Sequence, residues 1–368
     1  VLGNAHNAFN ALTSITMNGS TLSSTSTGYL LRGFNGALTM MDSTITGNPG
    51  DFAAASYTLC GNNTISGPTI TQGSGNFNVT SGTTTISSVL AYNLAGPTNG
   101  SLQKSGAGLL ILSGNNTSSA NVTISAGTLE IGAAGRLMAG NYNGTISNSA
   151  AFIYSGTNAQ TLSGVISGTG AITQNGTGML TLSNAANTYN GSTTINAGTL
   201  AVSGNISSSA LTINSGGVVS AGSTAAVAKF NAASLTVAGD SGYAFTIGNI
   251  SGGTAGTAGT DYDQIATSGA ITFNNTAANP FTVYINGTPT NWSSSDSYTW
   301  NILTGSSLSG FSSGNFIADY SSFGGALASG ASWTFGASGG NLTLTYGTAG
   351  TPTWAGGTGV WSGNFTPS

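Results

Sequence analysis

The chain has 368 residues, of which only 3% are charged and 58 are glycine, and its formal net charge is −4. Nucleic acid and anionic membranes are bound by clustered cations, so neither is expected as a partner of a chain whose basic residues are few and dispersed: Arg32, Lys104, Arg136 and Lys229. No run of about 18 apolar residues occurs, so we expect no membrane-spanning segment.

Residues 1–100 have the pattern of short, irregular β-strands joined by tight turns. Strands are predicted within 12–17, 37–45, 64–66 and 83–87, between turn pairs such as Asn18-Gly19. The segment around Phe9 is interpreted as a short cap or as a contact with a neighbouring molecule. We therefore assign residues 1–100 to irregular N-terminal coils.

Residues 101–224 are dominated by one repeated phrase. The first copy, at 106–132, reads GAGLLILSGNNTSSANVTISAGTLEIG, and the second, at 176–204, reads GTGMLTLSNAANTYNGSTTINAGTLAVSG. The copies begin at Gly106 and Gly176, and their Ala-Gly-Thr-Leu segments begin at Ala126 and Ala197, after a slip of one position. This period is too long for one coil of a solenoid, so each copy is expected to hold several short strands.

Within a copy, apolar and polar residues alternate with the period of a β-strand. Leu180 and Leu182 flank Thr181, and further short strands are predicted at 194–196 and 200–202. Strands this short bury a face only when many of them stack, which is the logic of a repeat protein. At about 20 residues and about 4.8 Å of rise per coil, the chain would form a rod of about 18 coils and roughly 90 Å.

The second copy resembles the autotransporter-associated β-strand repeat, also called the passenger-associated transport repeat. The family phrase, G-x-G-x-L-x-L-S-G-x-N-T-Y-x-G-x-T-T-I-x-x-G-T-L-x-V, matches nearly throughout, whereas the first copy has NTSSAN in place of the NTYNG segment. Segments 259–273 and 341–362 are similar to stretches that often flank such repeats. The resemblance implies a right-handed parallel β-helix, secreted to the exterior or cell surface of a Gram-negative bacterium.

Residues 225–350 are rich in aromatic residues and in longer predicted strands, such as 270–273, 280–285, 297–303 and 341–346. We expect wider coils or a β-sandwich-like cap that covers the open end of the helix, because a solenoid end exposes unpaired backbone groups. Core or cap packing is the favoured role for each aromatic side chain. Any that are exposed are candidates for binding a partner.

Residues 351–368 form a tail with two Trp residues and no core of its own. Trp354, Trp361 and Phe365 are, with Phe9, candidates for contacts between subunits. The alternative, weighed about equally, is that the tail folds back along its own coil.

Catalytic and metal-binding patterns are sparse in the sequence. Asp261 and Asp263 are the one close pair of carboxylates and a weak Ca²⁺ candidate, for which hydrogen bonding in a turn is the better explanation. His6 is the sole histidine, so a Ser-His-Asp arrangement is not expected, and no Cys/His cluster offers a Zn²⁺ site. Cys60 is alone and is interpreted as a small buried residue. No cofactor is expected.

These observations favour an all-β structural protein over an enzyme. The first hypothesis is a β-solenoid subunit that associates with copies of itself into a surface fibre, sheath or layer. It rests on the repeats and on the scarcity of the charged side chains that usually keep strands from associating. The alternative is an autotransporter-like adhesin that binds a surface or a cell-surface glycan. An enzyme acting on polysaccharides is the least favoured interpretation.

Overall fold

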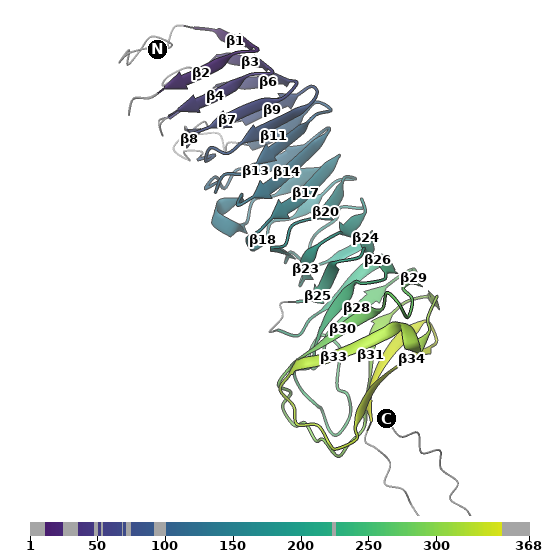
Figure 1. Cartoon of the computed structure of the whole chain (residues 1–368). Coiled ribbons are helices and arrows are strands. Elements are labelled where there is room, and N and C mark those ends of the chain that lie inside the picture. The colour runs from purple at the N-terminus through teal and green to yellow at the C-terminus, as the bar shows by residue number, and fades with distance from the viewer. Residues whose placement is uncertain are drawn as a thin grey trace, which may run out of the picture.

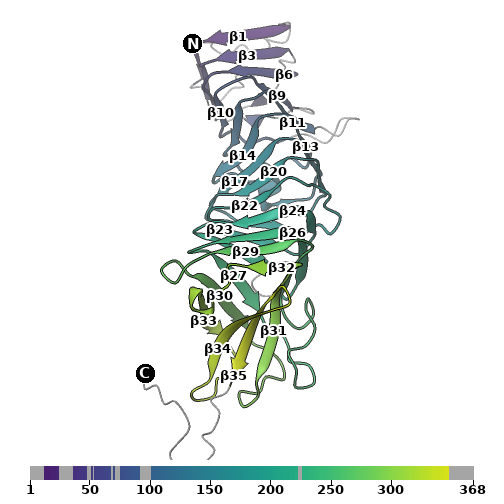
Figure 2. The ribbon, with the colours of Figure 1, turned by 90° about the vertical axis from the view of Figure 1, so that its right-hand side faces the viewer.

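The computed structural model describes residues 12–24, 36–47, 51–52, 54–67, 69–70, 75–91, 101–222 and 226–347, with side chains of 51–52 excepted. The chain winds into an elongated parallel β-helix in which coils stack in sequence order from one end to the other (Figures 1 and 2). The prediction of a parallel β-solenoid with an aromatic-rich C-terminal β region is thus confirmed. In the described residues no helix is long and apolar enough to cross a membrane.

Three sheets form the walls of the helix. The N-terminal sheet comprises β1 (Ser14–Asn18), β3 (Ala37–Met41), β6 (Ser56–Cys60), β9 (Gly75–Val79), β11 (Ser101–Ser105), β13 (Asn121–Ile124), β16 (Ile146–Asn148) and β19 (Ile166–Ser167). The C-terminal sheet comprises β15 (Asn141–Tyr142), β18 (Gln160–Leu162), β21 (Met179–Leu182), β23 (Gly198–Val202), β25 (Gly217–Ala221), β27 (Gly242–Thr246), β30 (Phe281–Gly287) and β33 (Phe316–Phe323).

The long sheet runs beside both. It comprises β2 (Thr21–Ser24), β4 (Thr44–Gly47), β7 (Asn63–Ser66), β10 (Thr83–Ile86), β12 (Leu109–Leu112), β14 (Thr128–Ala133), β17 (Ala151–Gly156), β20 (Ala171–Gln174), β22 (Thr193–Ile195), β24 (Ile206–Ile213), β26 (Lys229–Ala238), β28 (Gln264–Thr267), β29 (Ala270–Asn274), β31 (Tyr298–Thr304), β32 (Ser307–Ser309), β34 (Ser332–Ser338) and β35 (Asn341–Gly347). The remaining elements are β5 (Asp51–Phe52), β8 (Thr69–Ile70) and the 3₁₀ turns η1 (Met138–Gly140) and η2 (Ser313–Asn315).

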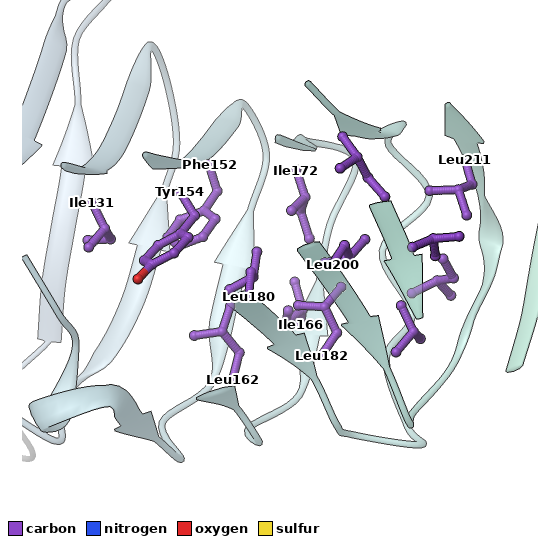
Figure 3. Packing of buried hydrophobic residues seen from close by; sticks show 14 of the residues in the cluster. Ile131, Phe152, Tyr154, Leu162, Ile166, Ile172, Leu180, Leu182, Leu200 and Leu211 are labelled. Atoms are coloured by element: carbon purple, nitrogen blue, oxygen red, sulfur yellow. The ribbon is translucent and has the colours of Figure 1, made fainter. Parts of the chain in front are cut away.

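The core consists of apolar columns that run along the helix axis. Leu162 pairs in register with Leu182, and Leu182 with Val202, and all three side chains are buried. Figure 3 shows Leu162 and Leu182 in this core. Full burial of a Leu or Val stabilises the fold by about 1.5–3 kcal/mol. A slip of one residue would turn every inward side chain outward, so the alternation in the sequence fixes the register.

The repeated Ala-Gly-Thr segment forms a corner that only glycine fits. Gly198 has a φ of +61°, and a Cβ atom there would lie 2.2 Å from the carbonyl oxygen of Gly176 in the preceding coil. Gly127, at the equivalent position of the first copy, has a φ of +66° and would meet the Gly106 carbonyl at 2.4 Å. Backbone conformation and close approach of coils therefore both select glycine at this corner.

A buried side-chain nitrogen donates hydrogen bonds to the backbone carbonyls of the corner at the start of each repeat. Lys104 Nζ donates hydrogen bonds to the carbonyl oxygens of Ser105, Gly106 and Ala126, at 2.9, 2.7 and 3.0 Å. At the equivalent position of the second copy, Gln174 Nε2 donates to the carbonyls of Gly176 and Gly178, both at 2.7 Å. Burial lowers the pKa of Lys104 to about 8, so the ammonium form still predominates at neutral pH. The sequence did not indicate this role.

A column of asparagine side chains follows one outer edge of the long sheet. Asn196 Nδ2 donates to Asn175 Oδ1 at 2.7 Å, and Asn214 Nδ2 donates to Asn196 Oδ1 at 2.6 Å. These residues, the asparagine column, directly follow β20, β22 and β24. Side-chain hydrogen bonds between asparagines thus link three successive coils at this edge.

The coils lengthen toward the C-terminal end. Thr161 pairs with Thr181 in the next coil, whereas Tyr243 pairs with Val283, so the chain between paired positions doubles in length. The wider coils expected for residues 225–350 are thus confirmed, whereas the count of about 18 coils in a rod of roughly 90 Å, which assumed about 20 residues per coil throughout, was wrong for this part of the chain. The extra residues form loops.

An antiparallel hairpin, β34 and β35, forms the C-terminal end of the long sheet. Strand β35 pairs antiparallel with both β31 and β34, and the side chains packed around it are aromatic. Trp292 and Trp333 have ring centroids 6.2 Å apart, and Trp333 lies 5.8 Å from the buried Trp300. Large rings fill the wide end of the core, so the predicted capping role of these aromatic residues is confirmed.

The donor role of Lys104 leads to a test. Lys104→Met should lower the free energy of unfolding by on the order of 3 kcal/mol, because several corner carbonyls lose their donor. Lys104→Gln, which copies position 174, should retain most of that stability. Urea unfolding followed by circular dichroism measures both, with Gln103→Met on the outer side of β11 as the neutral control. Equal losses in the Met and Gln variants would contradict the donor role.

Candidate functional site

Several residues predicted to make contacts lie outside the described residues. These are Phe9, Trp354, Trp361 and Phe365, and the same holds for His6 and for the whole tail at 351–368. Their assignment as contacts between subunits stays a prediction.

Cys60 was expected to be buried, and the structure corrects this. It is the last residue of β6 and is half-buried, with its Sγ 3.3 Å from the Oγ of Ser81 in the next coil. Leu59 takes the inward position, so the alternation of the strand turns Cys60 outward.

Asp261 holds a loop together. Its Oδ1 accepts a hydrogen bond from Asn249 Nδ2 at 2.8 Å, and its Oδ2 accepts one from the backbone N–H of Thr257 at 2.7 Å. The hydrogen bonds from Asn249 and Thr257 hold the pKa of this carboxyl below its usual range. Asp261 therefore acts as the turn residue that the sequence favoured over a Ca²⁺ ligand.

Asp263 lies deeper, directly before β28, and its side chain is fully buried. Oδ1 accepts from the backbone N–H of Ala228 and Oδ2 from that of Thr246, both at 2.8 Å. Burial outweighs these hydrogen bonds and raises the pKa of Asp263 to about 7. Across the described parts of the chain, no group of three or more His, Cys, Asp or Glu side chains is placed to hold a metal ion.

Most aromatic residues of the C-terminal region are packed, but two are not. Tyr284 is 37% exposed and Tyr320 is 47% exposed. They lie on the neighbouring strands β30 and β33 near the C-terminal end of the helix (Figures 1 and 2), together with Ile317, which is also 47% exposed. The sequence analysis named exposed aromatic residues of this region as candidates for binding a partner, without saying which. The structure identifies Tyr284 and Tyr320 as the exposed ones, with Ile317 beside them.

Residues of these two paired strands line an open hollow of about 480 Å³, the C-terminal hollow. It is lined by Thr282, Tyr284, Ile317, Ala318, Asp319, Tyr320 and Ser321. Tyr284 and Asp319 are direct partners in the register of β30 and β33, so a ring and a carboxylate are adjacent at its centre. The hollow is open and combines apolar surface with hydrogen-bonding groups, which suits binding rather than catalysis.

Two local features place the tyrosine rings. A Cβ atom at Gly242 would lie 2.5 Å from Cε2 of Tyr284, so the ring lies against the bare backbone of β27. The register between β30 and β33 then shifts after Tyr284. Tyr284 pairs with Asp319 and Asn286 pairs with Ser322, so β33 has one more residue than β30 between these pairs, which is a β-bulge. Such bulges re-aim side chains, and this one falls at Tyr320.

Sequence reasoning missed Asp319 and Ile317. Strand β30 carries a usable signal, since its inward Phe281, Val283 and Ile285 leave Tyr284 outward by alternation. No comparable signal exists in β33, because the bulge breaks the alternation there.

The raised pKa of Asp263 predicts how stability depends on pH. The folded state binds a proton between about pH 4 and pH 7 that the unfolded state has released, so the free energy of unfolding should fall as pH rises through this window. Between pH 5 and pH 7 the expected fall is on the order of 2 kcal/mol. Urea unfolding at a series of pH values measures it. Asp263→Asn, though less stable, should lose this slope, and an unchanged slope would contradict the assignment.

Comparison with known proteins agrees with the fold. The passenger-associated transport repeat family matches residues 102–131 and 172–202. The chain is 38% identical over 122 residues to the Adhesin BmaC autotransporter of Brucella suis biovar 1 (strain 1330), a match that covers 32% of this chain and 3% of that protein. The resemblance stated from the repeated phrase is therefore confirmed: this chain is a β-solenoid built in part from passenger-associated transport repeats.

Proposed function

We propose that this chain is a stretch of an extracellular, surface-displayed passenger and that it acts in adhesion. Two findings together support this most. The chain contains passenger-associated transport repeats, and it is 38% identical over 122 residues to part of a protein described as an adhesin. The comparison moves the weight from the structural subunit favoured by the sequence toward its adhesin alternative.

The physical form of the molecule suits this role. A solenoid grows in one dimension, so it can carry a contact surface away from a cell without a large globular core. The C-terminal hollow supplies such a surface on rigid strands. The catalytic alternative gains no support from the carboxylates Asp261 and Asp263, since both accept hydrogen bonds from the chain itself.

Adhesion can be tested with the full chain. Beads coated with the purified chain should be retained under flow on at least one of several surfaces that carry glycans, extracellular-matrix proteins or whole epithelial cells. Soluble chain should compete with that retention, because the number of sites is finite. Beads coated with albumin are the control, and retention no better than theirs on every surface would contradict the proposal.

A second candidate, association of the rod with copies of itself, is favoured by the outer face of the long sheet. Five threonines there are direct partners from coil to coil: Thr173, Thr194, Thr212, Thr236 and Thr272. The asparagine column lies beside them. The row of threonines is uncharged, and the strands of the long sheet carry only two charged residues, Glu130 on β14 and Lys229 on β26. Charged side chains, lysine above all, usually prevent lateral contact between sheets.

This candidate makes its own prediction. Electron microscopy over a concentration series should show ordered filaments or sheets for the natural chain. Thr194→Lys combined with Thr236→Lys should abolish them by charge repulsion without loss of folding. Thr161→Lys combined with Thr181→Lys, which places the same charges on the outer side of the C-terminal sheet, is the matched control. Isolated rods of the natural chain at every concentration would exclude this candidate.

A further inference from the structure

The C-terminal hollow concentrates exposed apolar surface. Among the described residues six large hydrophobic side chains are exposed, and three of them, Tyr284, Ile317 and Tyr320, line this one hollow. Single exposed apolar residues are normal on a protein surface, whereas a cluster of them marks a surface that a ligand covers.

The polar groups of the hollow are acceptors and hydroxyls. Asp319 Oδ1 accepts a hydrogen bond from the backbone N–H of Ser321 at 3.0 Å. Hydrogen bonding to Ser321 holds the pKa of Asp319 below its usual range, so the carboxylate is ionised at neutral pH. The hydroxyl groups of Thr282 and Ser321 complete the lining, which contains no basic side chain.

We propose that the C-terminal hollow binds a neutral glycan, with sugar rings stacked on Tyr284 and Tyr320 and sugar hydroxyls donating hydrogen bonds to Asp319. The inference rests on the proposed role in adhesion and names the ligand class. The C–H groups on the flat face of a sugar carry partial positive charge, which complements the negative face of a tyrosine ring. The hydroxyls at the sugar edge need acceptors, which an ionised carboxylate supplies.

Other ligand classes fit the lining less well. An anionic ligand would meet the Asp319 carboxylate with no cation in the lining to offset it. An apolar peptide would bury that carboxylate without a partner, which is costly. A lysine-rich peptide would satisfy Asp319 but would leave both hydroxyls without a role. A neutral glycan uses the rings, the hydroxyls and the carboxylate together.

The placement of Tyr284 supports stacking. Because its ring lies against the bare backbone at Gly242, this contact restricts the ring, which then loses little side-chain entropy when a ligand covers it. A ring already fixed in the binding orientation makes the hollow preorganised.

The test uses the full chain and an array of neutral oligosaccharides, with affinity for any oligosaccharide retained on the array then measured by titration calorimetry. Tyr284→Ala, Tyr320→Ala and Asp319→Asn should each weaken binding at least tenfold with unchanged circular dichroism. Tyr284→Phe, which keeps the ring, should retain most of the affinity. Leu327→Ala is the matched control, since Leu327 is also exposed, at 39%, but does not line the hollow.

Two outcomes would overturn the proposal. One is that no neutral oligosaccharide binds, or that a lysine-rich peptide binds instead and competes at the hollow. The other is that an oligosaccharide binds with an affinity that the two Tyr→Ala variants leave unchanged. The bead assay separates this failure from that of the broader role: coated beads retained equally by the natural chain and the Tyr variants leave adhesion standing without the glycan site.

Discussion

The whole structure depends on coils that stack in register. Outside the C-terminal hairpin of β34 and β35, strands pair with parallel strands of the neighbouring coils. Residues at equivalent positions then share a column, and many columns repeat one kind of side chain. The inward column through Leu162, Leu182 and Val202 is apolar, and the outer edge at Asn175 and Asn196 is amide. The sequence repeats because of this constraint, since a residue that suits one coil also suits the equivalent position in the neighbouring coils.

The same constraint explains which features could be predicted from the sequence. Alternation is a local property, so the strands around Leu180 and Leu182 and the glycine corner at Gly198 could be anticipated. Coil length is not local. It depends on where a loop rejoins the register, so wider coils could be expected for residues 225–350, whereas the doubling between Tyr243 and Val283 could not. Of the candidate site, sequence indicated exposed aromatic residues as a class, but the bulge that exposes Tyr320 exists only in the pairing of two strands.

The backbone carbonyls at the corners require hydrogen-bond donors, and the sequence pattern does not show which residues supply them. Where the chain turns between sheets, its carbonyl groups point toward the interior and need donors, since an unsatisfied buried group costs about 1–3 kcal/mol. Lys104 and Gln174 meet this need with different chemistry at equivalent positions. Lys104, one of four dispersed basic residues in a nearly uncharged chain, is thus part of the fold. Because Lys104 is buried, the outer surface carries even fewer charges than the composition indicates.

The end of the helix shows how a structural necessity can produce a binding surface. An exposed edge strand invites pairing with another chain, and proteins blunt such edges by covering them or by bulges. The hairpin of β34 and β35 pairs with the edge of β31 and so ends the long sheet, whereas β33 pairs with β30 alone among the described strands and carries a bulge. The bulge interrupts the regular row of backbone groups that a further strand would need, and it falls where Tyr320 is exposed beside Asp319. This edge disfavours the addition of a further strand, but it exposes tyrosine rings and a carboxylate. It therefore favours a ligand that is recognised through side chains, and a glycan is such a ligand.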